Sequence, residues 1–556
     1  MDMKIVLQEA IREAIHQAVS EGLFTLAMED LPAVVLTVPP QKEFGDYATN
    51  FAMQAARVAK ANPRKIAEAI VAHLRGTWLE RAEIAGPGFI NFYLKADWLY
   101  ELLQDILRQG SAYGNTTAGQ GQKVQVEFVS ANPTGPLHVG HGRGAAVGST
   151  LVNLLRAAGY EVQSEFYIND AGNQIDNLAA SVNARYLELL GQTVAFPEDG
   201  YHGHDIIDTA QRIINHEGDR YLNMTEAERL TVFKELVLSE KLAALKEDLA
   251  AFNVTFDVWF SERTLHEARS IDEVCRIFKE KGHMYEQDGA LWLRSTAGGD
   301  DKDRVVIRDN GVPTYLAADI AYHRNKLERG FDKLINIWGA DHHGYIPRVR
   351  AAIAALGYDP DCLEVLILQM VSLYQNGELV KMSKRTGQGV TLTELMEEVG
   401  RDAARFFFIM RSIDSQLDFD LDLAKSRSNE NPVYYIQYAH ARICSIFRQV
   451  QEAGISIGDV TACRLERLEE AAEIDLIKKL GDYPEEISNA AKERAVHRVA
   501  RYVHELAGLF HTFYNQCRII GVDQELQRSR IALVTAVQHT LRHGLAILGV
   551  DAPEKM

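Results

Sequence analysis

The chain has 556 residues, of which 47% are hydrophobic and 24% charged, and this ordinary globular composition excludes a disordered chain and a mini-protein. Its 59 Lys and Arg residues against 77 Asp and Glu give a net charge of −18, which excludes a chain that wraps nucleic acid with its whole surface but leaves a local basic surface open. Five scattered cysteines without a C-x-x-C pair, no apolar run near the roughly 18 residues of a membrane span and no signal-peptide pattern predict a cytoplasmic protein with no membrane contact.

The first part of the chain, residues 1–110, alternates helical and strand-like stretches. A helix is predicted within 66–75 and a strand over 88–94, which together indicate a small α+β domain. Residues 111–122 are rich in Gly and Thr and offer almost nothing to bury, so a linker is expected there.

A β-loop-α-β unit follows the linker. An alternating strand over 124–129 leads through a Pro- and Gly-rich loop into a helix of small residues over 138–158, and a second strand is predicted at 162–167. This order is typical of a parallel sheet, so the fold class is predicted to be α/β, with a Rossmann-like parallel-sheet domain over 123–425.

The rest of the chain is predicted to be mainly helical. An acidic helical insertion is expected at about 180–285, and short apolar runs predict further strands at 290–294, 304–308, 333–338 and 363–368. From 426 to 556 the strand signals fade, so an all-helical C-terminal domain is predicted.

The sequence His138-Val139-Gly140-His141 stands where the loop passes into the predicted helix. Two histidines three residues apart share a helix face, and free amides at a helix start favour anions, so the pattern suits a phosphate group. Gly140 would let a flat ligand approach the backbone. The alternative is a tight turn packed by histidines. A dinucleotide fingerprint is disfavoured because about ten residues separate Val129 from Gly140, whereas that fingerprint begins directly after its strand.

A second candidate is Lys381-Met382-Ser383-Lys384, which is flanked by glycines on both sides. Two lysines on a mobile polar loop can stabilise the charge that develops on a polyphosphate. Alone, such a loop is more typical of a solvated surface. It gains weight because it follows the first motif by about 240 residues within a parallel-sheet pattern.

With both motifs in this order, the chain resembles the class I aminoacyl-tRNA synthetases, whose signatures are His-Ile-Gly-His and Lys-Met-Ser-Lys. Only the exchange of Ile for Val at position 139 departs from them. Further segments are similar to the arginyl-tRNA synthetase family, and with the terminal regions they cover essentially the whole chain: 43–56, 127–151, 167–175, 311–323, 339–348, 368–371, 431–443 and 511–519. The resemblance implies that 1–110 is a tRNA-contacting domain, 123–425 the catalytic domain and 426–556 the anticodon-binding domain.

A guanidinium ligand needs a carboxylate that accepts paired N–H bonds, and Asp319, one helical turn after Tyr315, could offer an acceptor beside an aromatic wall. An ordinary helix-start Asp beside a core Tyr is the alternative. The resemblance implies an arginine pocket lined by Glu127, Asn132, His141, Tyr315, Asp319 and Gln369.

The resemblance also implies an ATP site, with Mg²⁺ carried by ATP. Its expected members are His138, Gly140, His141, His343, Lys381, Met382, Ser383 and Lys384. The catalytic residues implied are His138, His141, Lys381 and Lys384, acting by positioning and positive charge. Asp341-His342-His343 could instead bind zinc, but no third ligand stands at metal spacing, so no protein-bound metal is expected.

The implied reaction activates L-arginine with ATP and transfers it to tRNA(Arg), and the family trait of needing bound tRNA for efficient activation is implied with it. In the C-terminal domain an apolar face of one helix, from Val496 to Phe513, is predicted to lie opposite Arg494, Arg498 and Arg501. These arginines, with Tyr434 and Tyr438, are candidate tRNA contacts, and a solvated face is the alternative. A monomer is expected.

Two rival functions stay open from the residues alone. A small-molecule nucleotidyltransferase would share the first motif but leave the helical region after 426 without a purpose. A non-enzymatic tRNA-binding paralogue would be expected to lose Lys384 or a histidine of the first motif, and both are intact.

Overall fold

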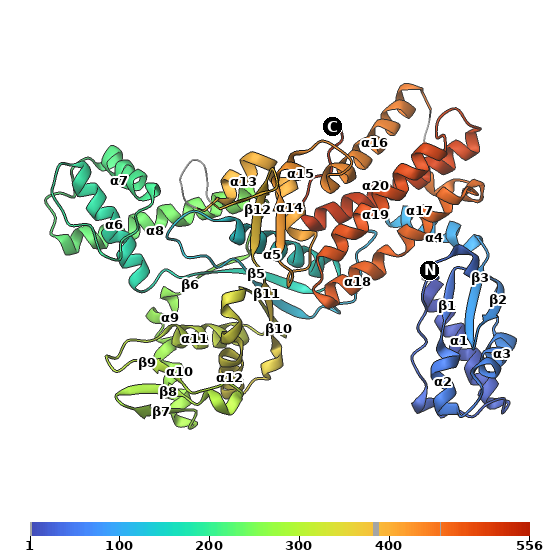
Figure 1. Cartoon of the computed structure of the whole chain (residues 1–556), viewed down its shortest axis with the longest axis horizontal. Coiled ribbons are helices and arrows are strands. Elements are labelled where there is room, and N and C mark those ends of the chain that lie inside the picture. The colour runs from blue at the N-terminus through green and yellow to red at the C-terminus, as the bar shows by residue number, and fades with distance from the viewer. Residues whose placement is uncertain (1–2, 382–388, 456–457) are drawn as a thin grey trace. The chain divides into compact units, whose positions relative to one another are not determined.

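The computed structural model describes residues 3–381, 389–455 and 458–556 (Figure 1). Met382, Ser383 and Lys384 of the second motif lie outside the described residues. The chain divides into two compact units. The first comprises residues 1–113, 443–483 and 508–540, and the second comprises 114–442, 484–507 and 541–556.

A parallel five-stranded sheet forms the centre of the second unit, as the β-loop-α-β pattern predicts. Its strands are β4 (Lys123–Glu127), β5 (Glu161–Ile168), β6 (Val258–Ser261), β10 (Lys333–Gly339) and β11 (Leu363–Leu368). They lie in the order β11-β10-β4-β5-β6. After β4 the chain adds β5 and β6 on one side of that strand, and later adds β10 and β11 on its other side. β4 and β10 therefore flank a topological switch point. Sheets of this kind bind ligands there, at the carboxyl ends of their strands.

Two helices position the site on this sheet. Helix α5 (Val139–Ala157) follows β4 and is built of small residues, so that it lies close to its neighbours. A Cβ atom at Gly148 would come within 2.2 Å of the Phe128 ring, which explains the glycine there. Helix α11 (Tyr315–Glu328) places Leu327 in a buried cluster with Leu334 of β10. It therefore covers the sheet face that carries every second residue of that strand, including Asn336.

The region predicted as a helical insertion is mostly helical. Its helices are α6 (Asn173–Leu189), α7 (His204–Glu217), α8 (Glu226–Ala251), α9 (Arg263–Glu267) and α10 (Ser270–Glu280). The expectation is wrong at Val258–Ser261, which forms the edge strand β6. Four residues are too few to show a strand period between helical stretches. A three-stranded antiparallel sheet follows, with β7 (Met284–Gln287), β8 (Ala290–Leu293) and β9 (Arg304–Ile307).

A third small sheet of the second unit leads into the second motif. It consists of β12 (Val371–Gln375), β13 (Glu378–Val380) and β14 (Leu417–Asp420). Strands β12 and β13 form a hairpin whose turn residues Asn376 and Gly377 have φ values of 53° and 76°. Both angles are left-handed, as a type I′ turn requires. Lys381 directly follows this hairpin.

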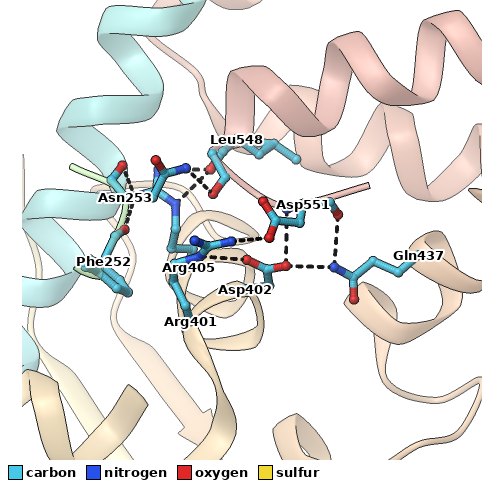
Figure 2. Close-up of polar contacts among 9 residues, drawn as sticks. Phe252, Asn253, Arg401, Asp402, Arg405, Gln437, Leu548 and Asp551 are labelled. Atoms are coloured by element: carbon cyan, nitrogen blue, oxygen red, sulfur yellow. Dashed lines mark hydrogen bonds and ion pairs between the residues drawn. The ribbon is translucent and has the colours of Figure 1, made fainter. Parts of the chain in front are cut away.

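Four further helices lie around the third sheet in the sequence, and one of them carries a buried arginine that joins several parts of the second unit. They are α12 (Ile346–Leu356), which precedes that sheet, and α13 (Leu392–Val399), α14 (Arg401–Ile409) and α15 (Leu421–Lys425). Arg405 of α14 is fully buried, and its guanidinium donates to the carbonyl oxygens of Phe252, Asn253 and Leu548 and to the Ser149 hydroxyl (Figure 2). Arg405 thereby satisfies carbonyls at the ends of helix α8 and of helix α20 (Gln524–Leu548) that have no partner within their helices.

A second network in Figure 2 lies beside Arg405 and is more exposed. The carboxylate of Asp402 accepts from Arg401, from the Gln437 side chain (2.8 Å) and from the backbone N–H of Asp551 (3.2 Å). The two networks tie α14, α16 and the C-terminal residues of the chain to one another.

The first unit contains the predicted α+β domain. The elements of this domain are α1 (Met3–Ser20), β1 (Tyr47–Thr49), α2 (Phe51–Ala59), α3 (Pro63–His73), β2 (Leu79–Ala85), β3 (Phe89–Leu94) and α4 (Asp97–Gln109). The first unit also contains helix α17 (Ala471–Gly481). The strands form an antiparallel sheet in the order β1-β3-β2. Tyr113, which the sequence places in a linker, is instead buried, and its hydroxyl donates to the Leu480 carbonyl at 2.6 Å.

Four long helices complete the chain: α16 (Pro432–Glu452), α18 (Tyr483–Glu493), α19 (His497–Gln516) and α20 (Gln524–Leu548). Among the described residues, α20 is long and apolar enough to cross a membrane by length and composition, which the sequence analysis did not expect. Of its most apolar stretch, 72% is buried inside the fold, as in a core helix.

We expect Arg405→Met to lower the free energy of unfolding by about 3 kcal/mol or more, because it leaves several buried carbonyls unpaired. Arg401→Met, one turn earlier on the same helix, removes a partly exposed ion pair and should cost about 1 kcal/mol or less. Thermal and urea unfolding of both variants measure the difference. Equal, small losses would show that Arg405 does not hold these elements together.

Candidate active site

The switch point of the parallel sheet gathers most of the residues that the sequence singles out. Glu127 ends β4, His138 begins α5, His343 follows β10, and Gln369 follows β11. Because all these strands run in the same direction, their carboxyl ends meet at one edge of the sheet. Residues as far apart in sequence as Glu127 and Gln369 are therefore brought to the same edge.

Glu127 is buried, and both of its carboxylate oxygens are bonded. One accepts from the Lys326 ammonium at 2.5 Å and the other from the Ser130 hydroxyl at 3.0 Å. Val129 and Ser130 have φ values of 66° and 43°, a left-handed conformation that is strained, above all for a β-branched residue. Ser130 also accepts from the Tyr167 backbone N–H at 3.1 Å. The strained turn thus aims a hydroxyl at Glu127, as strain at functional sites often does.

Asp319 lies on α11, half-buried, with a carboxyl pKa raised to about 7. Burial is the largest cause, the charges of Glu127 and Glu262 raise the pKa further, and Tyr345 and Lys326 lower it. Tyr315, one turn earlier, is 63% exposed at the start of the helix, so its ring is available to a ligand.

Three residues of this pocket escape sequence reasoning: Tyr167, Glu262 and Lys326. Glu262 is buried directly after β6, the strand that the sequence did not reveal. It raises the pKa of the Tyr167 hydroxyl, together with the burial of that ring. The signal that could have found Glu262 is its position after a short Val-Trp-Phe-Ser run, at the edge where Glu127 also ends its strand.

The pocket therefore carries more negative than positive charge. The charges of Glu127 and Glu262 act on the Asp319 carboxyl, and the Lys326 ammonium, which is paired with Glu127, opposes their effect. Burying carboxylates in excess of cations is unfavourable unless a cationic ligand completes the pairing. The arrangement suits a ligand that is positively charged and offers several N–H donors.

The first motif forms the cap of helix α5. His138 is its N-cap residue, and its Nδ1 accepts from the backbone N–H groups of Gly140 (3.1 Å) and His141 (3.4 Å). The Nδ1 of His141 accepts in turn from the His138 N–H at 3.3 Å, and the two rings stack 3.6 Å apart. Because each Nδ1 is an acceptor, the proton of each neutral ring lies on Nε2.

In the ligand-free protein the pKa values of both histidines are lowered. Desolvation lowers the pKa of His138, and desolvation with the neighbouring His138 lowers that of His141 to about 4. His141 is therefore neutral at pH 7. The two rings present Nε2–H donors, together with the start of a helix, which suits an anion such as phosphate.

Residues 390–392, which follow the second motif in the chain, are bonded to the first motif. The backbone N–H of Val139 donates to the Val390 carbonyl (3.3 Å), and that of Leu392 donates to the Leu137 carbonyl (2.7 Å). His138 and Thr391 form a β-bridge. The segment that follows the second motif is thus hydrogen-bonded to the start of α5, and Lys381 is exposed at the end of the β12–β13 hairpin.

The remaining predicted ligand residues lie at the same edge of the sheet. Asn132 is exposed in the loop between β4 and α5. His343 is exposed in the short 3-10 helix Ala340–Tyr345. The half-buried Gln369 accepts through its backbone carbonyl from the buried Arg143 guanidinium at 2.9 Å. A Cβ atom at Gly140 would lie 3.0 Å from the His138 ring, so this turn is tight.

No metal centre is found in the described part of the chain, because no three or more His, Cys, Asp or Glu side chains gather there in a way that could hold an ion. His342 approaches Asp341 to 3.4 Å, without a third group. The alternative of zinc at Asp341-His342-His343 thus has no support among the described residues.

The candidate tRNA residues do not form the single stripe that the sequence predicts. Arg494 precedes α19, has a φ of 56° and pairs with Glu364 at 3.2 Å. Arg498 is held by Glu486 and Glu493 at 2.7 and 2.6 Å. The helical period of the sequence does not show that an arginine side chain already has a carboxylate partner. Of the three, Arg501 is the widely exposed one, at 66% of its side chain, and its carboxylate neighbour Glu505 lies farther away, at 3.8 Å.

The aromatic candidates lie on α16. Tyr434 and Tyr438 stack with an interplanar angle of 9° and a centroid distance of 6.1 Å, and the Arg442 guanidinium lies 4.5 Å from the Tyr438 ring. Tyr434 also lines a surface cavity of about 410 Å³, together with Lys425 and Arg427.

Comparison with known proteins agrees with this fold. A family described as "Arginyl tRNA synthetase N terminal domain" matches residues 6–94, "tRNA synthetases class I (R), catalytic domain" matches residues 102–412, and "DALR anticodon binding domain" matches residues 436–556. The parallel sheet and the two motifs are thereby those of a class I aminoacyl-tRNA synthetase.

Individual relatives narrow this class. The arginine–tRNA ligase of Anoxybacillus flavithermus is 57% identical over 100% of this chain and 99% of its own length, and that of Carboxydothermus hydrogenoformans is 56% identical over 96% of both. The solved structure of the arginyl-tRNA synthetase of Thermus thermophilus, 26% identical, covers 99% of this chain and 100% of its own, with a TM-score of 0.74. The chain belongs to the arginyl-tRNA synthetase family, which confirms the resemblance and the predicted fold class.

The raised pKa of Asp319 makes a prediction for the ligand-free protein. Between its ordinary value of 3.8 and about 7, the folded state holds this proton and the unfolded state does not. The resulting stability is present at low pH and is lost as the pH rises through about 7. Asp319→Asn cannot ionise, so its melting temperature relative to wild type should be higher at pH 8 than at pH 5.

Thermal unfolding at several pH values between 5 and 8 measures this trend. Asp309→Asn, at an exposed turn, is the control and should show a constant difference. A constant difference for Asp319→Asn as well would contradict the raised pKa.

Proposed function

We propose that the chain activates L-arginine with ATP and transfers it to the 3′-terminal adenosine of tRNA(Arg). In the first step an arginine carboxylate oxygen attacks the α-phosphorus of ATP, and the bond to the bridging oxygen breaks to release pyrophosphate. In the second step a terminal ribose hydroxyl attacks the activated carbonyl, and AMP leaves. The observation that carries the proposal is the pocket in which Glu127, Glu262 and Asp319 outnumber Lys326.

Arginine would suit this site by its charge. Asp319 would accept paired N–H bonds from the guanidinium, and the exposed Tyr315 ring would cover it. Guanidinium binding favours the charged carboxylate, so it removes the proton that Asp319 holds without ligand. Glu127, Asn132, His141 and Gln369 are the further pocket residues of the proposal. A lysine ammonium would leave acceptors partly unpaired, which disfavours it by about 2–4 kcal/mol.

ATP would lie across the start of α5. The Nε2–H groups of His138 and His141 and the helix amides point to a phosphate site, and Gly140 leaves the backbone accessible to it. His343 at the end of β10 is proposed to contact the nucleotide. The second motif, Lys381, Met382, Ser383 and Lys384, belongs to the same proposed site. Mg²⁺ carried by ATP would offset the phosphate charge, with no residue of this chain assigned to hold it.

The two lysines are proposed to supply the positive charge that meets the negative leaving pyrophosphate. The two histidines are proposed to donate hydrogen bonds to the phosphates. No covalent enzyme intermediate is needed. The chain binds, orients and stabilises developing charge, and each part comes from a different strand end of the same sheet.

For tRNA we propose the stacked Tyr434 and Tyr438 with the exposed Arg501 and Arg427. Aromatic rings stack on unpaired bases and exposed arginines meet phosphates. Arg494 and Arg498, the other expected contacts, already have carboxylate partners, and we assign them to the stability of the fold.

A cytoplasmic, monomeric enzyme is part of the same proposal. All five cysteines are free thiols among the described residues, which is consistent with a reducing compartment. Light scattering of the purified chain measures its oligomeric state.

ATP–pyrophosphate exchange with each of the standard amino acids, with and without total tRNA, tests the proposed reaction. Exchange with arginine alone, stimulated by tRNA, is the expected result. Exchange that ignores both arginine and tRNA would favour a small-molecule nucleotidyltransferase, and no exchange at all would favour a tRNA-binding protein without activity.

We expect Lys384→Ala to lower the rate of arginine-dependent exchange by roughly a hundredfold or more while changing arginine affinity little, because the charge that this lysine meets develops on the pyrophosphate. Single-turnover kinetics and arginine titration separate the two quantities. A matching loss of arginine binding would show that the residue acts on the shape of the pocket instead.

We expect the double variant Arg427→Gln/Arg501→Gln to make the salt dependence of tRNA binding shallower by up to about two counterions. Arg498→Gln is the matched control, since it removes an arginine that is already ion-paired, and it should lower stability without changing the slope. Filter binding over a salt series measures the slopes. An unchanged slope in the double variant would place the RNA surface elsewhere.

A further inference from the structure

A buried lysine is paired with one of the carboxylates of the proposed arginine pocket. Lys326 of α11 has no exposed surface, and its ammonium contacts the Glu127 carboxylate at 2.5 Å and the Asn336 side-chain oxygen at 3.0 Å. It also lies 4.3 Å from the centre of the Tyr322 ring. A fully buried lysine is costly unless its charge is matched, so a position with this many partners serves a defined purpose.

The contacts of Lys326 continue as a directed chain to the second carboxylate of the pocket. Lys326 donates to the Asn336 oxygen, which turns the Asn336 amide group toward His323 Nε2, at 3.1 Å. His323 Nδ1 then donates to the backbone carbonyl of Asp319 at 2.8 Å. Burial lowers the pKa of His323 to about 3, so this ring stays neutral and keeps one donor and one acceptor.

Resting on the proposed function, we propose that Lys326 is a positioning residue for arginine specificity: it neutralises one carboxylate of the pocket and fixes the other, so that the pocket accepts a single further cation. By pairing with Glu127, Lys326 sets the net charge of the pocket. Through the hydrogen bonds of Asn336 and His323, it fixes the backbone position of Asp319. No group of arginine needs to touch it.

The charged and titratable groups around Asp319 determine how its ionisation should change when Lys326 is replaced. Glu127 on β4 and Glu262 after β6 oppose its ionisation, and Lys326 and Tyr345 favour it. Tyr167 of β5 also faces these carboxylates, whereas Glu165 of the same strand is already paired with Arg329 and Tyr322. Loss of the Lys326 charge should therefore raise the pH at which Asp319 ionises and arginine binds fully.

The test compares Lys326→Met with Lys241→Met in the full-length chain. Lys241 is the matched control, because it is also buried and paired with a carboxylate, Asp205, but lies on α8 of the helical insertion. Arginine binding and arginine-dependent pyrophosphate exchange are measured from pH 5.5 to 9.

For Lys326→Met we expect the arginine KM at pH 7 to rise tenfold or more, the kcat to change less than about threefold, and the pH midpoint of arginine binding to move up by about one unit. Lys241→Met should leave the midpoint unchanged. The double variant Lys326→Met/Glu127→Gln removes both charges and should return the midpoint toward wild type, which provides a second reading where the single variant fails to fold.

A merely structural lysine would lower stability in both single variants and leave the midpoint in place, and that result would overturn the inference. Failure of the wild-type chain to bind arginine would overturn the proposed function instead. The two failures are therefore distinguishable in one set of titrations.

Discussion

The ion pair between Glu127 and Lys326 is the interaction on which the site depends. It joins the end of β4 to the last turn of α11 and, through Asn336, to β10. These are the strands that flank the switch point of the sheet, where sheets of this kind bind ligands. With Lys326 committed to Glu127, the charges of Asp319 and Glu262 are left for a cationic ligand.

The site contains two features that are unfavourable in the ligand-free protein. The Asp319 carboxyl holds its proton up to about pH 7, and the Val129–Ser130 turn is strained. Both features reduce the stability of the ligand-free chain. The close-packed helix α5, which is itself bonded to the buried Arg405 through Ser149, belongs to the rigid structure around them. A site that is polar, buried and strained needs such support to keep its geometry.

The sequence predicted those parts of the molecule in which local pattern and chemistry coincide. The strands at 124–129, 333–338 and 363–368 were long enough to show their apolar character, and each is confirmed within one or two residues by β4, β10 and β11. The family expectation rested on two motifs and is confirmed by the comparisons. The roles of the individual site residues stay predictions.

The rest depended on tertiary contacts that no local pattern records. A four-residue edge strand hid Glu262, and a lysine on a helix, such as Lys326, resembles a surface residue until its carboxylate partner, 199 positions away, is known. The same reason explains why two arginines of the C-terminal region were predicted to contact tRNA. Arg494 is paired with Glu364 and Arg498 with Glu486, and the sequence does not show these pairs. The lowered pKa values at positions 138 and 141 likewise follow from desolvation in the fold, which the motif does not reveal.

The most direct test of the central claim, that excess negative charge selects the ligand, is calorimetric titration of the wild-type chain with arginine and with citrulline, its uncharged analogue of nearly the same shape. The account predicts that citrulline binds at least a hundredfold more weakly at pH 8, and that arginine affinity falls as the pH is lowered below about 7, as Asp319 takes up its proton. Comparable affinities for the two ligands, or an arginine affinity that does not change between pH 5.5 and 8, would contradict it.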